Sequence, residues 1–370
     1  MRRLKYLLPI VLPLLVSSCA TGGDSRPTSQ LSSPGFRAVS DFSAFQRTTN
    51  RFSGEVVLES AWIRSPFAWD ELVLSWNALT PIGTGLKFEA RSTARERPTK
   101  FYNLGQWADD TAERRRESVL GQKDDDGDVL TDTLVLRQPT EQVQLRITLF
   151  PSANGTFPTL KSVGLSYLNR SSAVVSMPPV KQAWGKSLSV PERSQLSYAG
   201  GRDWCSPTSV SMVLSYWSRR LDRPELNVDV PEVAAGVYDL NWPGTGNWPF
   251  NTAYAGRFVG MRAFVTRLAD LAELEAFVAA GVPPILSVSY DLLYGKARDR
   301  GNGHLVVCVG FTENGDPIVN DPWAEFEKGD KVRQVIPRAN LAKAWAHSRR
   351  TVYLIHPETW RVPSSPEGRW

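Results

Sequence analysis

The segment DWCSPTSVSMVLSYW, residues 203–217, decides the fold of the C-terminal half of the chain. Pro207 fits the first turn of an α-helix, where its missing N–H group costs nothing. The apolar residues after it recur at the spacing of one buried helix face: Val210, Val213, Leu214 and Trp217. We predict a helix from Pro207 to about Arg219 that places Cys205 at its N-terminus, where the macrodipole and free N–H groups favour a thiolate. A structural cysteine in a buried core is the alternative.

A nucleophilic thiol needs a base, and the chain offers three histidines. His347 lies in an Arg-rich helix end and His356 directly precedes a proline, whereas His304 follows the Gly-rich approach Gly301–Gly303 at the start of a predicted strand. Asp321 ends the next predicted strand and could orient the imidazole. These residues predict a site that combines a thiol, an imidazole and a carboxylate.

The position of Asp321 does not follow simply from the strand pattern. A two-residue turn at Asn314-Gly315 would set Asp321 opposite Cys308. That is four residues from His304, or roughly 13 Å at about 3.3 Å per residue. The site therefore requires a longer loop, a bulge or a bend, with Asn320 as the alternative orienting residue. We expect Cys308 to pack in the core. A disulfide with Cys205 would silence that thiol as a nucleophile, and a metal site is not expected because no zinc-type ligand spacing is present.

Four segments of the C-terminal half resemble one family. They are VPERSQ (190–195), DWCSPTSVSMVLSYW (203–217), GHLVVCVGF (303–311) and IVNDPW (318–323), in this order. They resemble the papain-like cysteine peptidases related to bacteriocin-processing, double-glycine-cleaving peptidases. The resemblance covers roughly residues 190–357. It implies that Cys205 is the nucleophile, His304 the general base and acid, Asp321 the orienting residue and Gln195 the side-chain donor to the oxyanion.

Two features depart from that family. The family usually has glycine directly after the cysteine, whereas this chain has Ser206, which could crowd the substrate. Gln195 lies ten residues before Cys205, with Gly200-Gly201 between them, so the intervening loop must fold back. Losing one oxyanion donor typically slows catalysis by roughly 100- to 1000-fold.

The first 18 residues predict a secretory signal. Arg2, Arg3 and Lys5 precede an apolar run from Leu7 to Val16 that is too short to span a membrane. Val16-Ser17-Ser18-Cys19 resembles the bacterial lipobox, which implies cleavage before Cys19 and its lipidation. We therefore expect residues 1–18 to be a signal peptide and the mature protein to be lipid-anchored on the extracytoplasmic side of a bacterial membrane. An ordinary signal peptide with a chance cysteine is the alternative.

The rest of the chain divides by its composition and periodicity. Residues 19–49 are predicted to be a flexible tether, 50–170 a β-sandwich, 171–189 a linker, 190–357 an α+β peptidase domain and 358–370 a loose tail. The clearest strand is Val143–Leu149, whose apolar residues alternate strictly with residues that we expect to face water. Pro178-Pro179 and the change to mixed helices and strands predict two independently folding units.

Aromatic residues are the candidate substrate contacts. Trp204 adjoins the cysteine, while Trp242 and Trp248 lie in a Gly-rich loop that could form one wall of a cleft; packing without ligand contact is the alternative. The predicted sandwich could bind a cell-envelope glycan or protein. Its tryptophans could stack on sugars, although core packing is the simpler explanation: Trp62, Trp69, Trp76 and Trp107. The acidic run 124–128 lacks the full calcium-loop spacing and is expected to be a solvated turn.

Charge and composition exclude other classes. Without the three basic residues of the signal, 40 basic residues face 38 acidic ones, so a net charge of +2 gives no argument for nucleic acid. We expect no cofactor and no metal. The prediction is a membrane-anchored thiol hydrolase that cleaves peptide or other amide bonds, and the alternative is a non-catalytic binding or scaffold lipoprotein with a peptidase-like domain.

Overall fold

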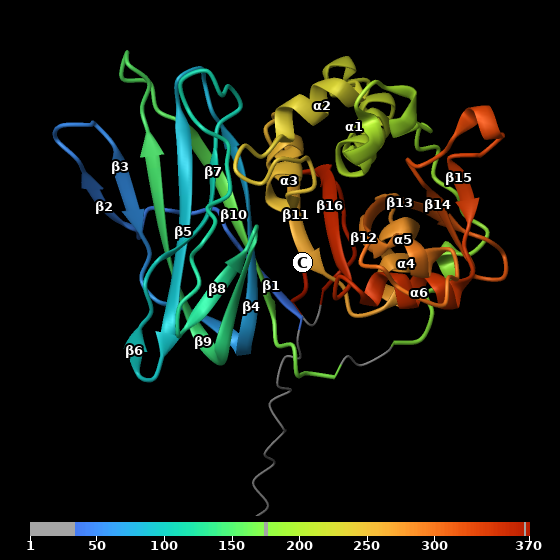
Figure 1. Cartoon of the computed structure of the whole chain (residues 1–370), viewed down its shortest axis with the longest axis horizontal. Coiled ribbons are helices and arrows are strands. Elements are labelled where there is room, and N and C mark those ends of the chain that lie inside the picture. Colours follow the sequence, from blue (N-terminus) through green and yellow to red (C-terminus); the bar gives the residue numbers. More distant parts are fainter. Residues whose placement is uncertain (1–33, 174–176, 366–367) are drawn as a thin grey trace, which may run out of the picture. The chain divides into compact units, whose positions relative to one another are not determined.

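The structure is a computed structural model that describes residues 34–173, 177–365 and 368–370. Cys19 and the signal-like segment lie outside these residues. The stretch Leu31–Trp370 forms one compact unit, in which an all-β region precedes a region of mixed helices and strands (Figure 1). Within the described ranges, no helix combines the length and the apolar character that a membrane crossing would need.

Ten strands build the described part of the first region: β1 (Gly35–Val39), β2 (Gln46–Thr49), β3 (Val56–Glu59), β4 (Ile63–Leu79), β5 (Gly85–Ala94), β6 (Arg97–Pro98), β7 (Tyr102–Trp107), β8 (Gly127–Leu130), β9 (Thr133–Phe150) and β10 (Thr159–Leu168). They join into a single sheet with the order β1-β10-β4-β9-β3-β2, to which β5, β6, β7 and β8 are attached through β9 and β5. The predicted sandwich of two packed sheets is therefore wrong.

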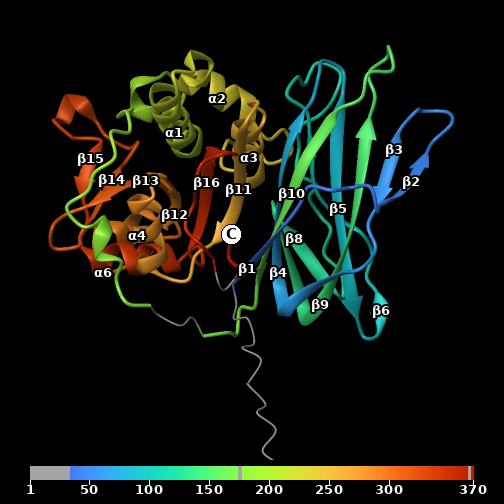
Figure 2. The same ribbon diagram turned by 180° about the vertical axis from the view of Figure 1, so that it is seen from behind.

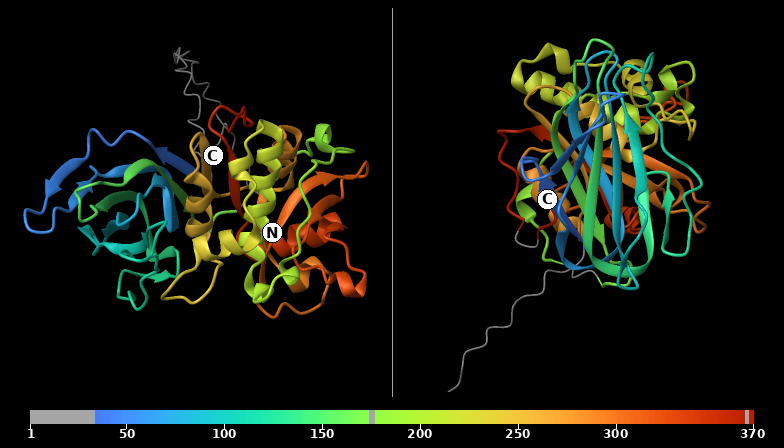
Figure 3. Two further views of the ribbon diagram at one scale, coloured as in Figure 1. Left: turned by 90° about the horizontal axis from the view of Figure 1, so that it is seen from above. Right: turned by 90° about the vertical axis from the view of Figure 1, so that its left-hand side faces the viewer.

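The sheet curls into a half-barrel (Figure 3). The pairing of β4 with β9 shifts register twice, between Arg64 and Glu71. Such bulges bend a strand and increase its twist, so one long sheet closes partly on itself. The curl explains why the all-β pattern predicted the class of this region correctly but not its architecture.

The predicted strand Val143–Leu149 is part of β9, and the prediction is confirmed for its apolar face but not for its polar face. Val143 and Leu145 are fully buried in the core, as the alternation requires. Gln144 and Thr148, which were expected to face water, are also buried, at 8% and 4% exposure. Gln144 donates to the carbonyl oxygen of Ser60 at 2.7 Å, which satisfies its amide in this environment.

Helices and strands alternate in the second region: α1 (Cys205–Leu221), α2 (Val230–Val237), α3 (Trp248–Gly256), β11 (Met261–Arg267), α4 (Leu271–Ala279), β12 (Ile285–Ser289), α5 (Tyr290–Leu293), β13 (Gly303–Phe311), β14 (Pro317–Asn320), β15 (Arg333–Val335), α6 (Arg338–Ala346) and β16 (Thr351–Pro357). The strands form a second antiparallel sheet with the order β11-β16-β12-β13-β14-β15. Every residue of β13 after Gly303 is buried, so both faces of the sheet are covered there.

Local signals account for the helices that position the site. The predicted α1 is confirmed, and it lies along β13 and β16 (Figure 2). Helix α4 begins at a capped N-terminus, because the Asp270 side chain accepts from the N–H groups of Ala272 and Glu273. Gly281, with φ of +79°, follows its C-terminal end.

The two regions share a continuous interface. Helix α3 packs against both β4 and β11 (Figure 1). Its Phe250 ring lies 6.1 Å from the Trp76 ring, measured between the ring centroids. The Asn77 side chain donates to the carbonyl oxygen of Ala263 at 2.6 Å and accepts from its N–H at 3.0 Å. This pairing replaces a backbone hydrogen bond between β4 and β11 and leaves no polar group of Asn77 unsatisfied.

Three predicted connecting segments are more ordered than expected. The prediction of a flexible tether over residues 19–49 is wrong from Gly35 onward, because β1 pairs with β10. The predicted linker ends against the second sheet, where the Leu188 N–H bonds to the Val309 carbonyl oxygen at 2.7 Å. The predicted loose tail is also wrong, because Arg369 is 3% exposed and pairs with Glu273 at 2.6 Å.

Candidate active site

Cys205 is the first residue of α1, and its side chain is half-buried and free. The first hydrogen bond of this helix runs from the Thr208 N–H to the Trp204 carbonyl oxygen at 2.9 Å. The N–H groups at the start of the helix therefore lack partners within it and point toward the space beyond Cys205. This arrangement favours negative charge on a group held at the Cys205 position.

His304 is held between Cys205 and Asp321. Its ring lies at the start of β13 and is 5% exposed, and Nε2 is 2.7 Å from Asp321 Oδ1. The other ring nitrogen is left for Cys205, which is one of the two neighbours that favour the charged imidazole. Burial opposes the charged imidazole, but the Asp321 carboxylate and Cys205 together raise the pKa of His304 to about 10. The structure therefore stabilises an imidazolium next to the sulfur.

Asp321 follows β14 directly and is itself fixed by two donors. The Trp323 N–H donates to Oδ1 at 2.8 Å, and the Tyr294 hydroxyl donates to Oδ2. Burial works against the charged carboxylate, but His304, Tyr294 and Trp323 lower its pKa below the ordinary value of 3.8. Asp321 is therefore an oriented anion whose position two neighbours determine.

The strand register reduces the offset expected for Asp321 from four residues to two. The turn between β13 and β14 is longer than two residues, because the Thr312 N–H bonds to the Asp316 carbonyl oxygen at 2.8 Å. A bulge between Cys308 and Gly310 then places Val307 opposite Asn320. Asn320, the alternative orienting residue, instead directs its amide to the carbonyl oxygens of Val190 and Pro191.

Gln195 does not present a free donor to the cleft. It is 1% exposed, and its side-chain Nε2 donates to the carbonyl oxygens of Gly201 at 2.8 Å and Arg202 at 2.7 Å. The expected oxyanion donor therefore holds the loop before Cys205. Gly201 is required there, because a Cβ atom would lie 1.9 Å from the Gln195 carbonyl oxygen. Because Gly201 and the Gln195 backbone approach each other this closely, the loop between Gln195 and Cys205 can fold back.

Ser206 faces away from the cleft. Its side chain is fully buried, and its hydroxyl lies 3.0 Å from the Tyr353 hydroxyl of β16. The glycine-to-serine departure therefore does not crowd the space beside Cys205. The hydroxyl instead bonds α1 to the second sheet.

A cleft of about 1010 Å³ opens at Cys205 and His304. Trp242 and Trp248 form part of its lining, as one of the two interpretations of their loop predicted, whereas Trp204 is not part of it. Loop residues 300–303 form part of another wall. This volume is at the upper limit of the range usual for small-molecule pockets, about 300–1000 Å³.

Buried Asp291 holds the loop that leads to His304. Its carboxylate pairs with Lys296 at 2.9 Å and Arg300 at 3.0 Å, and it also accepts from the Asn302 amide at 3.4 Å. A second carboxylate, Asp299, accepts from the Ser289 hydroxyl at 2.9 Å. These contacts fix the Gly-rich approach that forms one side of the cleft.

Three site residues were not found from the sequence. Tyr290 packs its ring edge to face with His304 at 5.3 Å, and Tyr294, one helical turn later, bonds to Asp321. His347 lines the cleft and pairs with Asp299 at 2.8 Å. The spacing of the two tyrosines could have placed them on one helix face, but not next to His304.

Cys308 lies in the core of the second sheet. It is fully buried and free, and burial raises the pKa of its thiol to about 12. Across the parts of the chain that the structure describes, no three His, Cys, Asp or Glu side chains gather as a metal site would require.

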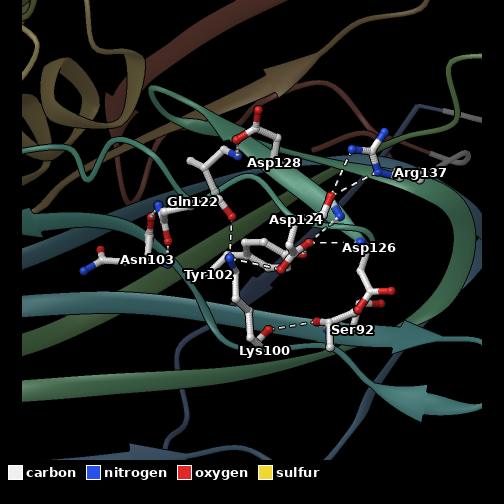
Figure 4. Close-up of polar contacts among 12 residues, drawn as sticks. Ser92, Lys100, Tyr102, Asn103, Gln122, Asp124, Asp126, Asp128 and Arg137 are labelled. Atoms are coloured by element: carbon white, nitrogen blue, oxygen red, sulfur yellow. Dashed lines mark hydrogen bonds and ion pairs between the residues drawn. The ribbon is translucent and has the colours of Figure 1, made fainter.

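The acidic run of the first region is a bonded turn (Figure 4). Asp124 accepts from the Tyr102 hydroxyl at 2.6 Å and pairs with Lys100 at 3.0 Å, while Asp126 pairs with Arg97 at 2.9 Å. The carboxylates of Asp124 and Asp126 therefore hold this loop, whereas a solvated turn was expected. Core packing, the simpler explanation for the tryptophans of this region, is confirmed for three of the four: Trp69, Trp76 and Trp107.

Comparison with known proteins gives two matches that together cover most of the chain. Residues 25–167 match the Peptidase C39 N-terminal domain, and residues 187–353 match the Peptidase C39 like family. No curated protein matches the chain. Among solved structures, a protein described as a C39-like peptidase from Bacillus anthracis has 17% sequence identity and a TM-score of 0.35, and the match covers 47% of this chain and 96% of that one.

Proposed function

Because the chain joins a C39 N-terminal domain to a C39-like peptidase domain, we propose that it is a papain-like cysteine peptidase that acts on peptide bonds. The proposal assigns Cys205 as the nucleophile, His304 as the base and Asp321 as the orienting residue. One observation carries it: His304 is buried between an oriented carboxylate and a thiol at a helix start.

The proposed reaction has two halves. The Cys205 sulfur, its proton held by His304, attacks the carbonyl carbon of the scissile bond and forms a C–S bond. The imidazolium gives its proton to the leaving amine as the C–N bond breaks, and an acyl-enzyme remains. Water then attacks the acyl carbon, His304 takes the water's proton, and the C–S bond breaks to release the acid and restore the thiol.

The start of α1 supports stabilisation of the oxyanion. The free N–H of Cys205 can donate to the oxygen that becomes negative in the tetrahedral intermediate. Gln195, which the resemblance implies as the second donor, is better supported as a positioning residue, because both of its amide hydrogens are used by the loop before Cys205.

Alkylation of Cys205 against pH tests the proposed site. The pKa of His304 is raised to about 10, so the imidazolium next to the sulfur persists through neutral pH. Labelling of Cys205 by iodoacetamide, read by mass spectrometry, should therefore stay fast from about pH 7 to about pH 9 and slow at least about tenfold in His304→Ala near neutral pH. Cys308 is the internal control and should stay unlabelled.

Peptide cleavage is measured separately. A proteome-derived peptide mixture is incubated with the protein, and new termini are identified by mass spectrometry, with Cys205→Ala as the inactive control. Equal labelling of Cys205 in wild type and His304→Ala, together with no new termini, would support a non-catalytic scaffold instead.

We also propose that Cys19 anchors the mature protein to a membrane on its extracytoplasmic side. The support is the lipobox-like sequence at Val16–Cys19. Cys19→Ala should move the protein from the membrane fraction to the soluble fraction after cell lysis, because a lipid on Cys19 would be its attachment. Membrane retention of this variant would rule out the anchor, and Cys308→Ala is the control that should not change the distribution.

A further inference from the structure

The cleft at Cys205 does not end at its aromatic wall. A second hollow of about 420 Å³ lies beyond it, and the two share five lining residues: Trp242, Gly246, Trp248, His347 and Ser348. The hollow is completed by the first region, from the turn between β8 and β9. A molecule that leaves the cleft past Trp242 and Trp248 therefore reaches the sheet of the N-terminal domain.

The N-terminal domain also holds the shared wall in place. The Trp248 N–H donates to the Asp132 carboxylate at 2.8 Å. The Asn241 amide donates to the Ser118 carbonyl oxygen at 3.0 Å, and the Leu240 N–H bonds to the Arg116 carbonyl oxygen at 3.2 Å. The aromatic loop is thus attached at both ends to residues of the first region.

Within the loop, buried Asp239 gathers the remaining donors. One carboxylate oxygen accepts from the N–H groups of Ser118, Asn241 and Trp242, and the other accepts from the Asn247 amide at 3.0 Å. The wall is therefore built from both domains rather than by the peptidase domain alone.

Except for Asp132, whose carboxylate accepts from the Trp248 N–H, the charged side chains that line the hollow are paired, which suits the hollow to uncharged groups. Glu71 pairs with Arg349 at 3.2 Å, and Arg170 pairs with Asp70 at 3.0 Å. Leu130 adds an apolar side chain that is 59% exposed.

Two residues with positive φ also line the hollow. Thr131 has φ of +60° and Arg349 has φ of +55°, and both line the hollow. The left-handed region is unfavourable for a β-branched residue such as threonine, and such strain collects at ligand-binding positions. It supports a binding role for the turn, alongside the continuity with the cleft.

We infer that the cleft and the hollow form one groove that binds an extended, uncharged stretch of the substrate polypeptide, with its far end on the N-terminal sheet. The inference rests on the proposed peptidase function and names its substrate class: a polypeptide that spans both domains rather than a small amide. The N-terminal domain then acts as part of the substrate site.

Thiol-directed peptides of different length test the groove on the full chain. Two series of uncharged Ala/Leu peptides carry a chloroacetyl group at the N-terminus or a chloromethyl ketone at the C-terminus. Each alkylates the Cys205 sulfur as a C–S bond forms and chloride leaves. Peptides of about two and about eight residues reach roughly 7 and 26 Å when extended at about 3.3 Å per residue. Iodoacetamide serves as the reference without a peptide.

In at least one series, the long peptide should label Cys205 about tenfold faster than the short one, as one or more further apolar contacts would give. Leu130→Glu should abolish this gain without changing the iodoacetamide rate. The matched control is Ile82→Glu, which changes an exposed apolar residue of a different turn and should keep the gain.

Equal rates for short and long peptides in both series, with normal iodoacetamide labelling, would overturn the groove and leave the proposed function standing. If the long peptide still labelled Cys205 faster in Leu130→Glu, the groove would also be overturned, because the peptide would then not pass Leu130. No labelling of Cys205 by any reagent would overturn the proposed function and this inference together.

Discussion

Tyr294 controls the orientation of Asp321 through one hydrogen bond, since its hydroxyl donates to the carboxylate oxygen that His304 does not use. Tyr294→Phe removes this donor and keeps the ring. A hydrogen bond to a charged group contributes about 1.5–3 kcal/mol, so we expect kcat for a cleaved peptide to fall about tenfold with KM nearly unchanged. Tyr102→Phe is the control, because it removes a similar bond to Asp124 in the first region. Similar losses in both variants would point to stability and not to orientation.

The start of α3 depends on a buried carboxylate of the first region, Asp132, which accepts from the Trp248 N–H. Burial raises the pKa of Asp132 from 3.8 to about 6, against the hydrogen bonds that lower it. A raised pKa means that the folded state binds the proton more tightly. Its contribution to stability is therefore present below about pH 4 and is lost as the pH rises through about 6.

Asp132→Asn keeps an oxygen that can accept from the Trp248 N–H but has no proton to lose. We therefore expect the stability of this variant not to fall as the pH rises. In urea unfolding, the free energy of unfolding of the variant relative to wild type should increase from about pH 4 to about pH 6 and then stay constant. Asp124→Asn is the matched control, because hydrogen bonds to Tyr102 and Lys100 outweigh burial and lower the pKa of Asp124 to about 2. Its difference from wild type should change much less in that range, and in the opposite direction. If the difference between Asp132→Asn and wild type did not change between about pH 4 and about pH 6, the raised pKa of Asp132 would be contradicted.

The joined domains are expected to unfold together. The sequence predicts two separately folding units, but the contacts of Asn77 and Phe250 between the two regions argue against them. Exposing an apolar side chain such as Phe250 costs about 1.5–3 kcal/mol. Residues 177–370 expressed alone should therefore have a lower urea midpoint than the intact chain, measured by fluorescence, or be insoluble. An unchanged midpoint would show that the peptidase domain is independent.

Local patterns in the sequence were sufficient for the elements and much of the candidate site. The spacing of apolar residues after Pro207 predicts α1 and hence the position of Cys205 at its start, because helix periodicity and the proline preference act over a few residues. The Gly-rich approach to His304 and the strand that ends before Asp321 were likewise visible. Their proximity was inferred from chemistry and from the family resemblance, not from spacing.

Local patterns in the sequence do not predict the contacts between residues that are far apart in the chain. Period-two alternation shows which face of a strand is apolar, but not whether a second sheet or helix α3 covers it, so a sandwich was expected where one sheet curls. The Gln195 amide could point to the substrate or to the carbonyl oxygen of Gly201, and only the folded loop selects the second. Residues 203–217 determine a helix with a thiol at its start, because helix formation is local. The bulge in β13, the Tyr294 bond and the wall supplied by the N-terminal domain arise only when segments far apart in the chain pack together.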